Sequence, residues 1–284
     1  PTSYGDSPYQ SFSSYAGNPY FIDLDDLAAE GLLEPKEYQG LDWGSNPEYV
    51  DYGLMYKTRY LVLKKAADRL LAAPPAEYKL FCKTSTWLDD YALFMALKDK
   101  HSGASWFTWP EEIRLRRKSA LSAAKKELAG QIDFWKAVQF LFFRQWKAFK
   151  GYANDKGVHI IGDLPIYVSG DSADVWANPE QFQLDENGLP TEVAGCPPDG
   201  LSADGQLWGN PLFRWDVMKE NGYQWWLKRI AFQFTIYDML RIDHFRGFDA
   251  YYAIPYGDET AKNGRWRSGP GLDFFKTVNA KLGK

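Results

Sequence analysis

The sequence has little that would place it in an oxidising compartment, in a membrane or on a polyanion. Its 2 cysteines, Cys82 and Cys196, make neither a disulfide framework nor a metal-binding spacing, so we expect reduced thiols in a cytoplasmic protein. No stretch approaches the roughly eighteen consecutive apolar residues of a membrane-spanning helix, so no membrane partner is expected. The 33 basic residues do not outnumber the 37 acidic ones, and the net charge of −4 argues against nucleic acid as a partner.

Aromatic residues are what the sequence has in excess. It contains 12 Trp, 18 Tyr and 18 Phe among 284 residues, of which 45% are hydrophobic, enough for a sizeable core. Aromatic rings pack well in cores, but their flat faces and polar edges also suit the C–H faces and hydroxyl rims of sugars. The composition therefore indicates a globular protein with carbohydrate as a candidate ligand.

The stretch "GDSPYQSFSSYAGNPYF", residues 5–21, concentrates these rings in a segment that cannot be regular. Turn formers interrupt it at Gly5, Pro8, Asn18 and Pro19. Five rings lie between them: Tyr9, Phe12, Tyr15, Tyr20 and Phe21. These residues alone leave two interpretations open, because the rings could cap a hydrophobic core or form a platform for a sugar.

The first half of the chain is predicted to be mainly helical. A short helix is expected within residues 23–33, and apolar spacing predicts a helix in residues 87–103 with Gly103 as its stop. Residues 113–128 are also predicted to be helical, and we interpret their six basic side chains as a solvated face. The stretch 134–149 is apolar nearly all round, which is typical of a helix buried on several sides.

After residue 150, predicted helices alternate with predicted strands. One strand is expected at residues 158–161, ending at Gly162 and Asp163, and another in "DMLRIDHFRG" after a helix around residues 225–237. This alternation is typical of a parallel sheet or a (β/α) barrel. Between the two strands, "FQLDENGLPTEV" predicts a hairpin turning at Asn187-Gly188, and residues 195–213 are expected to form a long irregular loop that carries function.

Charged side chains gather at the ends of these two strands. In a strand, Arg241 and Asp243 share one face, while the apolar residues beside them share the other, so we expect a charged pair at the end of a buried strand. The pair could be a structural salt bridge, or a carboxylate kept ionised as a nucleophile or charge stabiliser. His244 follows directly, either as a donor to substrate or as a turn residue, and Asp163 ends the other strand.

Four stretches of the sequence resemble one enzyme family in wording and order. They are "GDSPYQSFSSYAGNPY", "GDLPIYVSGDSADVWANP", "GCPPDGLSADGQLWGNPLF" and "RIDHFRGFDAYYAIP". Together they resemble the 4-α-glucanotransferases called amylomaltases or disproportionating enzymes, and the resemblance runs through nearly the whole chain. It implies an α/β fold, a (β/α)₈ barrel of the α-amylase type that is incomplete in this chain, with a helical insertion and a loop/hairpin insertion.

The resemblance also implies a division of the chain. The expected parts are a barrel segment with a donor-side loop (1–44), a helical insertion (45–130), a barrel helix and strand (131–168), an insertion over the active site (169–220), and a barrel helix with the nucleophile strand (221–284). The rings of residues 4–21 would form one wall of an α-1,4-glucan groove.

Site residues follow from the resemblance position by position. Asp243 would be the nucleophile that forms a glycosyl-enzyme, with Arg241 orienting it and His244 binding the sugar at the cleavage site. The further substrate-binding residues would be Tyr9, Ser7, Asp163, Asp199, Gln206 and Trp208. The implied reaction transfers α-1,4-glucan segments with retention between maltooligosaccharides or glucans derived from starch or glycogen. It needs no metal and no organic cofactor.

Two departures from the family pattern limit this expectation. The family supplies its general acid/base Glu in an "EDLG" motif and a further Asp later, and neither is among the 284 residues, which resemble an internal portion of a longer enzyme. We therefore expect these residues alone to be inactive. Gly200-Leu201 stands where relatives often carry an aromatic residue, which affects acceptor preference. An α-amylase-type hydrolase and a non-catalytic glucan-binding remnant are the alternatives.

Overall fold

The computed structural model describes residues 1–283 as a mixed α/β fold. The helices are α1 (Leu24–Ala29), α2 (Tyr52–Ala72), α3 (Ala76–Thr84), α4 (Leu88–Lys100), α5 (Glu111–Arg114), α6 (Lys118–Glu127), α7 (Ala129–Asp155), α8 (Ala173–Ala177), α9 (Trp215–Glu220), α10 (Gln224–Ile236) and α11 (Gly271–Leu282). The strands are β1 (Ile161–Pro165), β2 (Glu192–Cys196), β3 (Gln206–Pro211), β4 (Met239–Asp243), β5 (Ala250–Pro255) and β6 (Arg265–Ser268). None of the described helices is long and apolar enough to cross a membrane.

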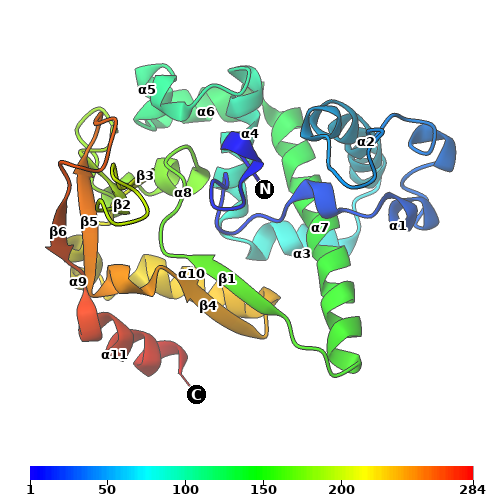
Figure 1. Ribbon diagram of the computed structural model, residues 1–284. Coiled ribbons are helices and arrows are strands. Elements are labelled where there is room, and N and C mark those ends of the chain that lie inside the picture. Colours follow the sequence, from blue (N-terminus) through cyan, green and yellow to red (C-terminus); the bar gives the residue numbers. More distant parts are fainter. Residues whose placement is uncertain (284) are drawn as a thin grey trace.

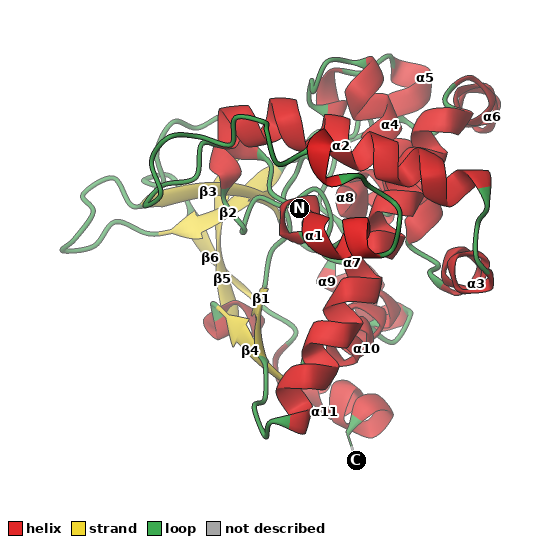
Figure 2. Ribbon diagram, turned by 90° about the vertical axis from the view of Figure 1, so that its right-hand side faces the viewer, coloured by secondary structure: helices red, strands yellow, loops and turns green. Residues whose placement is uncertain are grey.

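The strands form two separate sheets. In Figure 1, helices α2, α3, α4 and α7 lie at the centre and right, the antiparallel sheet, in the order β3-β2-β5-β6, lies at the left, and α5 and α6 lie at the top. The parallel pair β1-β4 lies below and between them, with α10 close by, and Figure 2 shows the same separation of helices and strands from the side. Within residues 1–283 the parallel sheet contains these two strands and no others.

Each parallel strand follows directly on a long helix, as the alternation predicted. Helix α7 leads into β1, α10 leads into β4, and Asp163 pairs in register with Arg241. The side chain of Asp238 ties the two entrances together, because its carboxylate accepts hydrogen bonds from the Ile160 backbone N–H (2.8 Å) and from Asn154 (2.9 Å). The predicted parallel pairing is confirmed.

The first strand lies further along the chain than its apolar run predicted. The run begins at Val158, but β1 begins at Ile161. Residues 156–160 are instead used to end α7: Gly157 takes a left-handed conformation (φ 74°), and the N–H of Val158 donates to Ala153 O at 2.9 Å. The prediction of a strand at 158–161 was therefore wrong by several residues, because backbone N–H groups in this segment bond to carbonyls at the end of α7 and not to a neighbouring strand.

The predicted helix of residues 87–103 is confirmed as α4, which packs against α7 at the centre of the helical half. Gly103 takes φ 79° and its N–H donates to Lys98 O at 2.7 Å, which ends the helix as expected. In α7, Val138 and Leu141 are buried as predicted, but Phe149 is exposed. Residues 23–33 contain α1, also as predicted.

The continuous helix predicted for residues 113–128 is divided into α5 and α6. Arg116 adopts a left-handed conformation (φ 55°) at the break, where its guanidinium pairs with Asp90 (2.6 Å) and lies 4.2 Å from the centroid of the Trp176 ring. The expected solvated face therefore holds for the exposed residues Arg117 and Lys118 but is wrong for Arg116, which turns inward.

Two further predictions concern the segment between β1 and β4. Gly188 turns the predicted hairpin with φ 77°, and a bridge joins Leu184 to Pro190. The long loop predicted at residues 195–213 is irregular only in part, because residues 206–211 form β3 and pair with β2. Cys82 and Cys196 form no disulfide within the described chain.

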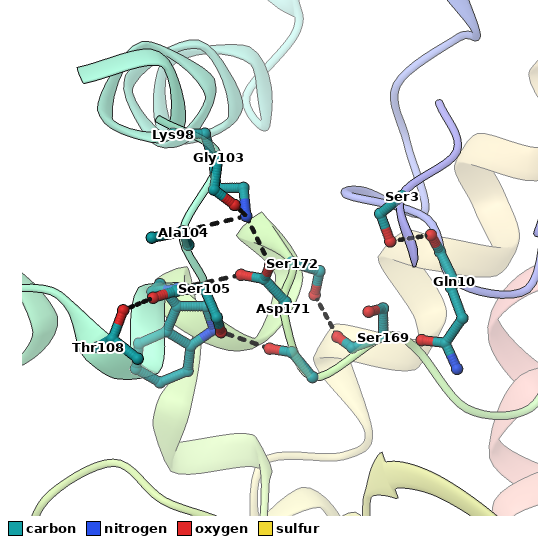
Figure 3. A network of polar contacts seen from close by, with 12 residues as sticks. Ser3, Gln10, Lys98, Gly103, Ala104, Ser105, Thr108, Ser169, Asp171 and Ser172 are labelled. Atoms are coloured by element: carbon teal, nitrogen blue, oxygen red, sulfur yellow. Dashed lines mark hydrogen bonds and ion pairs between the residues drawn. The ribbon is translucent and has the colours of Figure 1, made fainter. Parts of the chain in front are cut away.

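A buried polar network joins the end of α4 to the segment that follows β1. Lys98 is buried, and its ammonium group lies 2.6 Å from the carboxylate of Asp171 and 2.7 Å from Gly103 O (Figure 3). Asp171 also accepts the backbone N–H of Trp106 at 3.1 Å, and the Trp106 indole donates to Gly170 O at 2.7 Å. The helical half thus holds residues 169–172 in place beside the carboxyl end of β1.

Candidate active site

Arg241 lies between two carboxylates on adjacent parallel strands. Its Nε is 3.2 Å from Asp163 Oδ1, and its Nη2 is 2.7 Å from Asp243 Oδ1. The register explains the contact, because Asp163 stands opposite Arg241 and Asp243 follows two residues later on the same face. Tyr9 extends the cluster by donating its hydroxyl proton to Asp163 Oδ2 at 3.3 Å.

These charges are accessible to solvent. The side chains of Arg241, Asp163 and Asp243 are 63%, 40% and 39% exposed, so the expectation of a pair at the end of a buried strand was wrong for the described chain. The reason is that β4 is paired along one edge only, with β1. In the described chain, ion pairs this exposed contribute little to stability.

The electrostatics of the cluster favour a charged Arg241 and a neutral Tyr9. The hydrogen bond to Asp243 and then the attraction of Asp163 raise the pKa of the Arg241 guanidinium above its usual value. The charge of Asp163 is the largest cause of a raised pKa at the Tyr9 phenol, so this hydroxyl keeps its proton at neutral pH. The cluster therefore offers one fixed cation, two carboxyl groups and one phenol that donates.

His244 adopts a backbone conformation that is uncommon for residues other than glycine. Its φ of 52° and ψ of 44° lie in the left-handed region, and its carbonyl accepts the N–H of Gly247 at 3.0 Å. Its Nε2 is buried and has no hydrogen-bond partner among the described residues. Burial lowers the pKa of the imidazole, which is therefore neutral at pH 7 and free to hydrogen-bond a ligand.

Gly247 allows the turn after β4 to pack closely on the segment after β1. A Cβ at this position would lie 2.7 Å from Ile166 Cδ1 and 3.4 Å from His244 Cδ2. A residue with a side chain would therefore displace Ile166. The turn is thus held at a fixed distance from β1 by contact.

A cavity of about 510 Å³ opens at the carboxyl ends of β1 and β4, and we call it the site cavity. It is lined by Tyr9, Gln10, Pro165, Ile166, Tyr167, Leu207, Trp208, Asn210, Asp243 and His244. Trp208 comes from β3 and meets His244 edge to face, with ring centroids 4.8 Å apart. Aromatic walls with a few polar groups at one end are typical of small-molecule sites.

The structure brings most of the predicted site residues to this cavity. Tyr9, Asp243, His244 and Trp208 line it, and Arg241 and Asp163 contact Asp243 and Tyr9 from beside it. Ser7 and Gln206 lie one contact away: Ser7 Oγ accepts the backbone N–H of Tyr9 (3.3 Å), and Gln206 Oε1 accepts the Trp208 indole N–H (3.0 Å).

Asp199 lies apart from the other predicted residues. It is exposed and does not line the site cavity. Its Oδ1 accepts the backbone N–H groups of Leu201 and Ser202, each at 2.8 Å, so its contacts shape the loop that precedes β3. Leu201 itself is fully exposed at the tip of that loop.

Several residues at the site were not predicted from the sequence, among them Tyr167, Asn210 and Arg229. Tyr167 lines the cavity, and its ring centroid lies 6.3 Å from that of Trp208 and 6.3 Å from that of His244. Asn210 lines it while donating to Val168 O at 2.9 Å. Both lie inside stretches that the resemblance quoted, and their place in the motifs was the available signal. Arg229 lies beneath the cavity, and its only signal was a cation in a helix of mostly apolar residues.

Arg229 fixes the cavity floor through the backbone. Its guanidinium is buried, with Nη1 3.0 Å from Ile166 O and Nη2 2.7 Å from Pro165 O. Burial lowers the pKa of Arg229 to about 10, so it remains protonated at neutral pH. Its charge faces Asp174, whose carboxylate is also buried.

The rings of residues 5–21 divide between the two interpretations. Tyr9 is 48% exposed and lines the site cavity. Phe12 packs on Phe94 (6.2 Å between centroids) and Tyr15 on Trp87 (6.1 Å), so these rings cover the core. Phe21 is exposed elsewhere on the surface. The expectation that the whole stretch forms a wall of the groove was wrong, because one ring of the five reaches the cavity.

Comparison with known proteins identifies relatives along the whole chain. A family model described as 4-alpha-glucanotransferase matches residues 1–284. The chain is 47% identical to the 4-alpha-glucanotransferase of Clostridium butyricum, covering 99% of the chain and 58% of that protein. It is 48% identical to that of Thermus thermophilus, covering 100% of the chain and 57% of that protein. The chain thus spans somewhat over half the length of these relatives.

A solved structure is similar over the same span. The amylomaltase from Streptococcus agalactiae, determined in complex with acarbose, superposes with a TM-score of 0.98 and is 43% identical. The match covers 100% of this chain and 58% of that one.

Proposed function

The chain belongs to the 4-alpha-glucanotransferase family, and we propose that its protein transfers α-1,4-glucan segments from one maltooligosaccharide to another. The observation that carries the proposal is the position of Arg241 between Asp163 and Asp243, at the aromatic site cavity. The substrates are maltooligosaccharides and glucans derived from starch or glycogen.

In the proposed mechanism Asp243 is the nucleophile of a retaining double displacement. Arg241 hydrogen-bonds Asp243 Oδ1, which leaves Oδ2 to attack the anomeric carbon while the bond to the leaving sugar breaks. The leaving oxygen takes a proton from an acid. In the second step an acceptor hydroxyl attacks the glycosyl-enzyme and returns its proton to the same group, which frees Asp243.

Sugar binding is assigned to the groups around that carboxylate. The neutral imidazole of His244 and the phenol of Tyr9 are placed to hydrogen-bond hydroxyl groups, and Trp208 offers an aromatic face. A glucan that fills the cavity would exclude water while the covalent intermediate persists, which favours transfer over hydrolysis.

We propose that the acid/base group lies outside the described residues. Among residues 1–283, Asp243 is the one carboxyl group that lines the site cavity, and a retaining mechanism needs a second carboxyl group about 5–5.5 Å away. The resemblance assigns that role to a Glu in an "EDLG" segment, which the 284 residues do not contain. Residues 1–284 alone are accordingly proposed to be inactive.

We propose that β1 and β4, with the helices before them, are consecutive units of a (β/α)₈ barrel. Residues 45–130 would be its helical insertion and residues 169–220 the insertion above the site.

The unpaired thiols of Cys82 and Cys196 agree with a cytoplasmic location.

Incubation with maltotriose tests the proposed function. The protein, at the full length that its gene encodes, is expected to release glucose together with maltodextrins longer than maltotriose. Glucose and maltose without longer products would identify an α-amylase-type hydrolase instead. Binding of maltotriose without any new product would identify a non-catalytic glucan-binding protein.

A further inference from the structure

Asp174 is a buried carboxylate that the proposed mechanism does not use. It lies on α8, and 4% of its surface is exposed. Its Oδ2 accepts the backbone N–H of Ser14 and its Oδ1 accepts the Ser14 hydroxyl, both at 2.7 Å. A carboxylate is unfavourable away from water unless it is hydrogen-bonded, so these two bonds offset part of the cost of its burial.

Ser14 is held from two helices, α8 and α10 (both labelled in Figure 1). Gln233 on α10 is buried, and its Nε2 donates to Ser14 O at 2.7 Å. The N–H, the hydroxyl and the carbonyl of Ser14 are therefore all bonded to the side chains of Asp174 and Gln233. Two residues earlier, Phe12 O accepts the N–H of Ala173 at 2.8 Å. The backbone of residues 12–14 is thus fixed to the helices.

This fixed segment leads back to Tyr9 at the site cavity. Tyr9 lines that cavity and donates its hydroxyl proton to Asp163 at 3.3 Å. A small cavity of about 150 Å³ lies beside it, and Tyr9, Asp163, Ser14, Arg229 and Gln233 are among the residues that line it. Because the Tyr9 ring is half exposed and borders this space, packing alone does not fix it. Its position depends on where the backbone of residues 9–14 is held.

The same carboxylate faces the cation that holds the cavity floor. Burial raises the pKa of Asp174, while the hydrogen bonds from Ser14 and then the charge of Arg229 oppose that rise. Arg229 in turn donates to the carbonyls of Pro165 and Ile166. Asp174 therefore contacts the segment that carries Tyr9 and also stabilises the charge beneath the site cavity.

From this geometry we propose that Asp174 is a positioning residue, which fixes Tyr9 at the donor side of the site cavity through Ser14. The inference rests on the proposed function, because that function assigns Tyr9 to sugar binding. A Tyr9 that is already held beside Asp163 presents its hydroxyl to the sugar without first ordering residues 9–14. Less conformational entropy is then lost when the donor glucan binds.

The test compares two variants of the protein at full length in transfer from maltotriose. Asp174→Ala is expected to raise KM about fivefold and to change kcat less than about twofold, because the contacts of Asp243 with Arg241 remain. Asp174→Asn is expected to keep KM near the wild-type value. Its carbonyl can accept the Ser14 N–H while its NH₂ group donates to the Ser14 hydroxyl oxygen.

This comparison separates positioning from stability. Both variants lose the charge that faces Arg229, so both should melt at a lower temperature than the wild type. KM values raised equally in the two variants, or a fall in kcat without a rise in KM, would overturn the proposal. Asp99→Ala is the matched control: Asp99 accepts the Trp135 indole N–H at 2.8 Å on α4 and does not line the site cavity of the described chain.

A second comparison asks whether the effect passes through Tyr9. In a Tyr9→Ala protein, Asp174→Ala should raise KM less than about twofold, because no phenol is left to position. The same rise in KM with and without Tyr9 would contradict the proposal. Should Asp174→Ala fail to fold, Ser14→Ala removes one of the two hydrogen bonds and should show the same dependence on Tyr9.

Hydrogen exchange distinguishes failure of this inference from failure of the proposed function. The amides of residues 9–14 should exchange faster in Asp174→Ala than in Asp174→Asn, whether or not the protein transfers glucan. Equal exchange in the two variants would overturn the positioning role. A wild-type protein that forms no longer maltodextrins would refute the proposed function, and the exchange measurement would still decide whether Asp174 holds this segment.

Discussion

The ring of Trp208 meets the ring of His244 edge to face, with the centroids 4.8 Å apart and the planes at 90°. The two residues come from different sheets, Trp208 from β3 and His244 from the turn after β4. Their contact forms a wall of the site cavity where the antiparallel sheet meets the turn after β4. This wall of the cavity therefore depends on two elements that are distant in the sequence.

Trp208→Ala is expected to lower the transfer rate about tenfold, because the variant loses an aromatic face for sugar and the neighbour of His244. Its melting temperature should change little, since Trp208 is only partly buried. Trp266→Ala is the matched control: Trp266 lies in the same sheet, is 44% exposed and does not line the cavity. A larger loss of melting temperature than of transfer in Trp208→Ala would identify Trp208 as a core residue.

His244 is expected to make the protein less stable in acid. Burial is the main cause of its lowered pKa, with Arg246 lowering it further and Asp243 opposing them. The unfolded chain therefore takes up the proton first, at a pKa of about 6.5. Stability is unaffected above that value and falls as the pH drops below it toward the folded-state pKa.

Comparison with His244→Gln isolates this effect. The free energy of unfolding, measured in urea at pH 7.5 and pH 5.5, should fall more between the two values in the wild type than in the variant. His101 also has a pKa lowered by burial, but it is present in both proteins and cancels in the difference. If the free energy of unfolding depended equally on pH in the two proteins, the lowered pKa of His244 would be contradicted.

Gly247→Ala is expected to destabilise the turn after β4 by about 1–3 kcal/mol, because the added Cβ would lie 2.7 Å from Ile166 Cδ1. Ile166→Val removes that atom, so the double variant should recover much of the loss in a thermal or urea unfolding measurement. The quantity that decides is the coupling free energy, which is the destabilisation of the double variant minus the sum of the destabilisations of the two single variants. Strictly additive effects would show that this contact does not hold the turn in place.

Arg229→Lys should lower both stability and activity although it keeps the charge. A lysine cannot reach the carbonyls of Pro165 and Ile166 together, whereas the planar guanidinium donates to both. Loss of this buried cation altogether, in Arg229→Met, should destabilise the fold by about 1–3 kcal/mol, because two carbonyls lose their donors. Arg117→Met is the control on an exposed surface. Unfolding free energies unchanged in both Arg229 variants would mean that the cavity floor is held by other contacts.

Local sequence patterns predicted much of this arrangement. The helix before each parallel strand, the shared face of Arg241 and Asp243, and the stop at Gly103 are consequences of short-range periodicity and capping, which the sequence contains directly. The pairing of Asp163 with Arg241 needed only the assumption that the two strands are parallel neighbours. These parts of the site were predictable for that reason.

Other parts depend on contacts between distant segments. The break at Arg116 is stabilised by Asp90 and Trp176, and strand β3 forms only because β2 lies beside it. Arg229 acts on backbone carbonyls, which carry no signal in the sequence. No periodicity within a segment reports such partners, so the broken helix, the third strand and the cavity floor were missed.

The most direct test of the account is to trap the glycosyl-enzyme. The protein at full length would be incubated with an α-maltosyl fluoride in the absence of an acceptor, then digested, and its peptides mapped by mass. A sugar adduct is predicted on the peptide that contains Asp243, at the side chain hydrogen-bonded by Arg241. An adduct on any other carboxylate, or an Asp243→Asn protein that keeps most of its transfer activity, would contradict the assignment of Asp243 as the nucleophile.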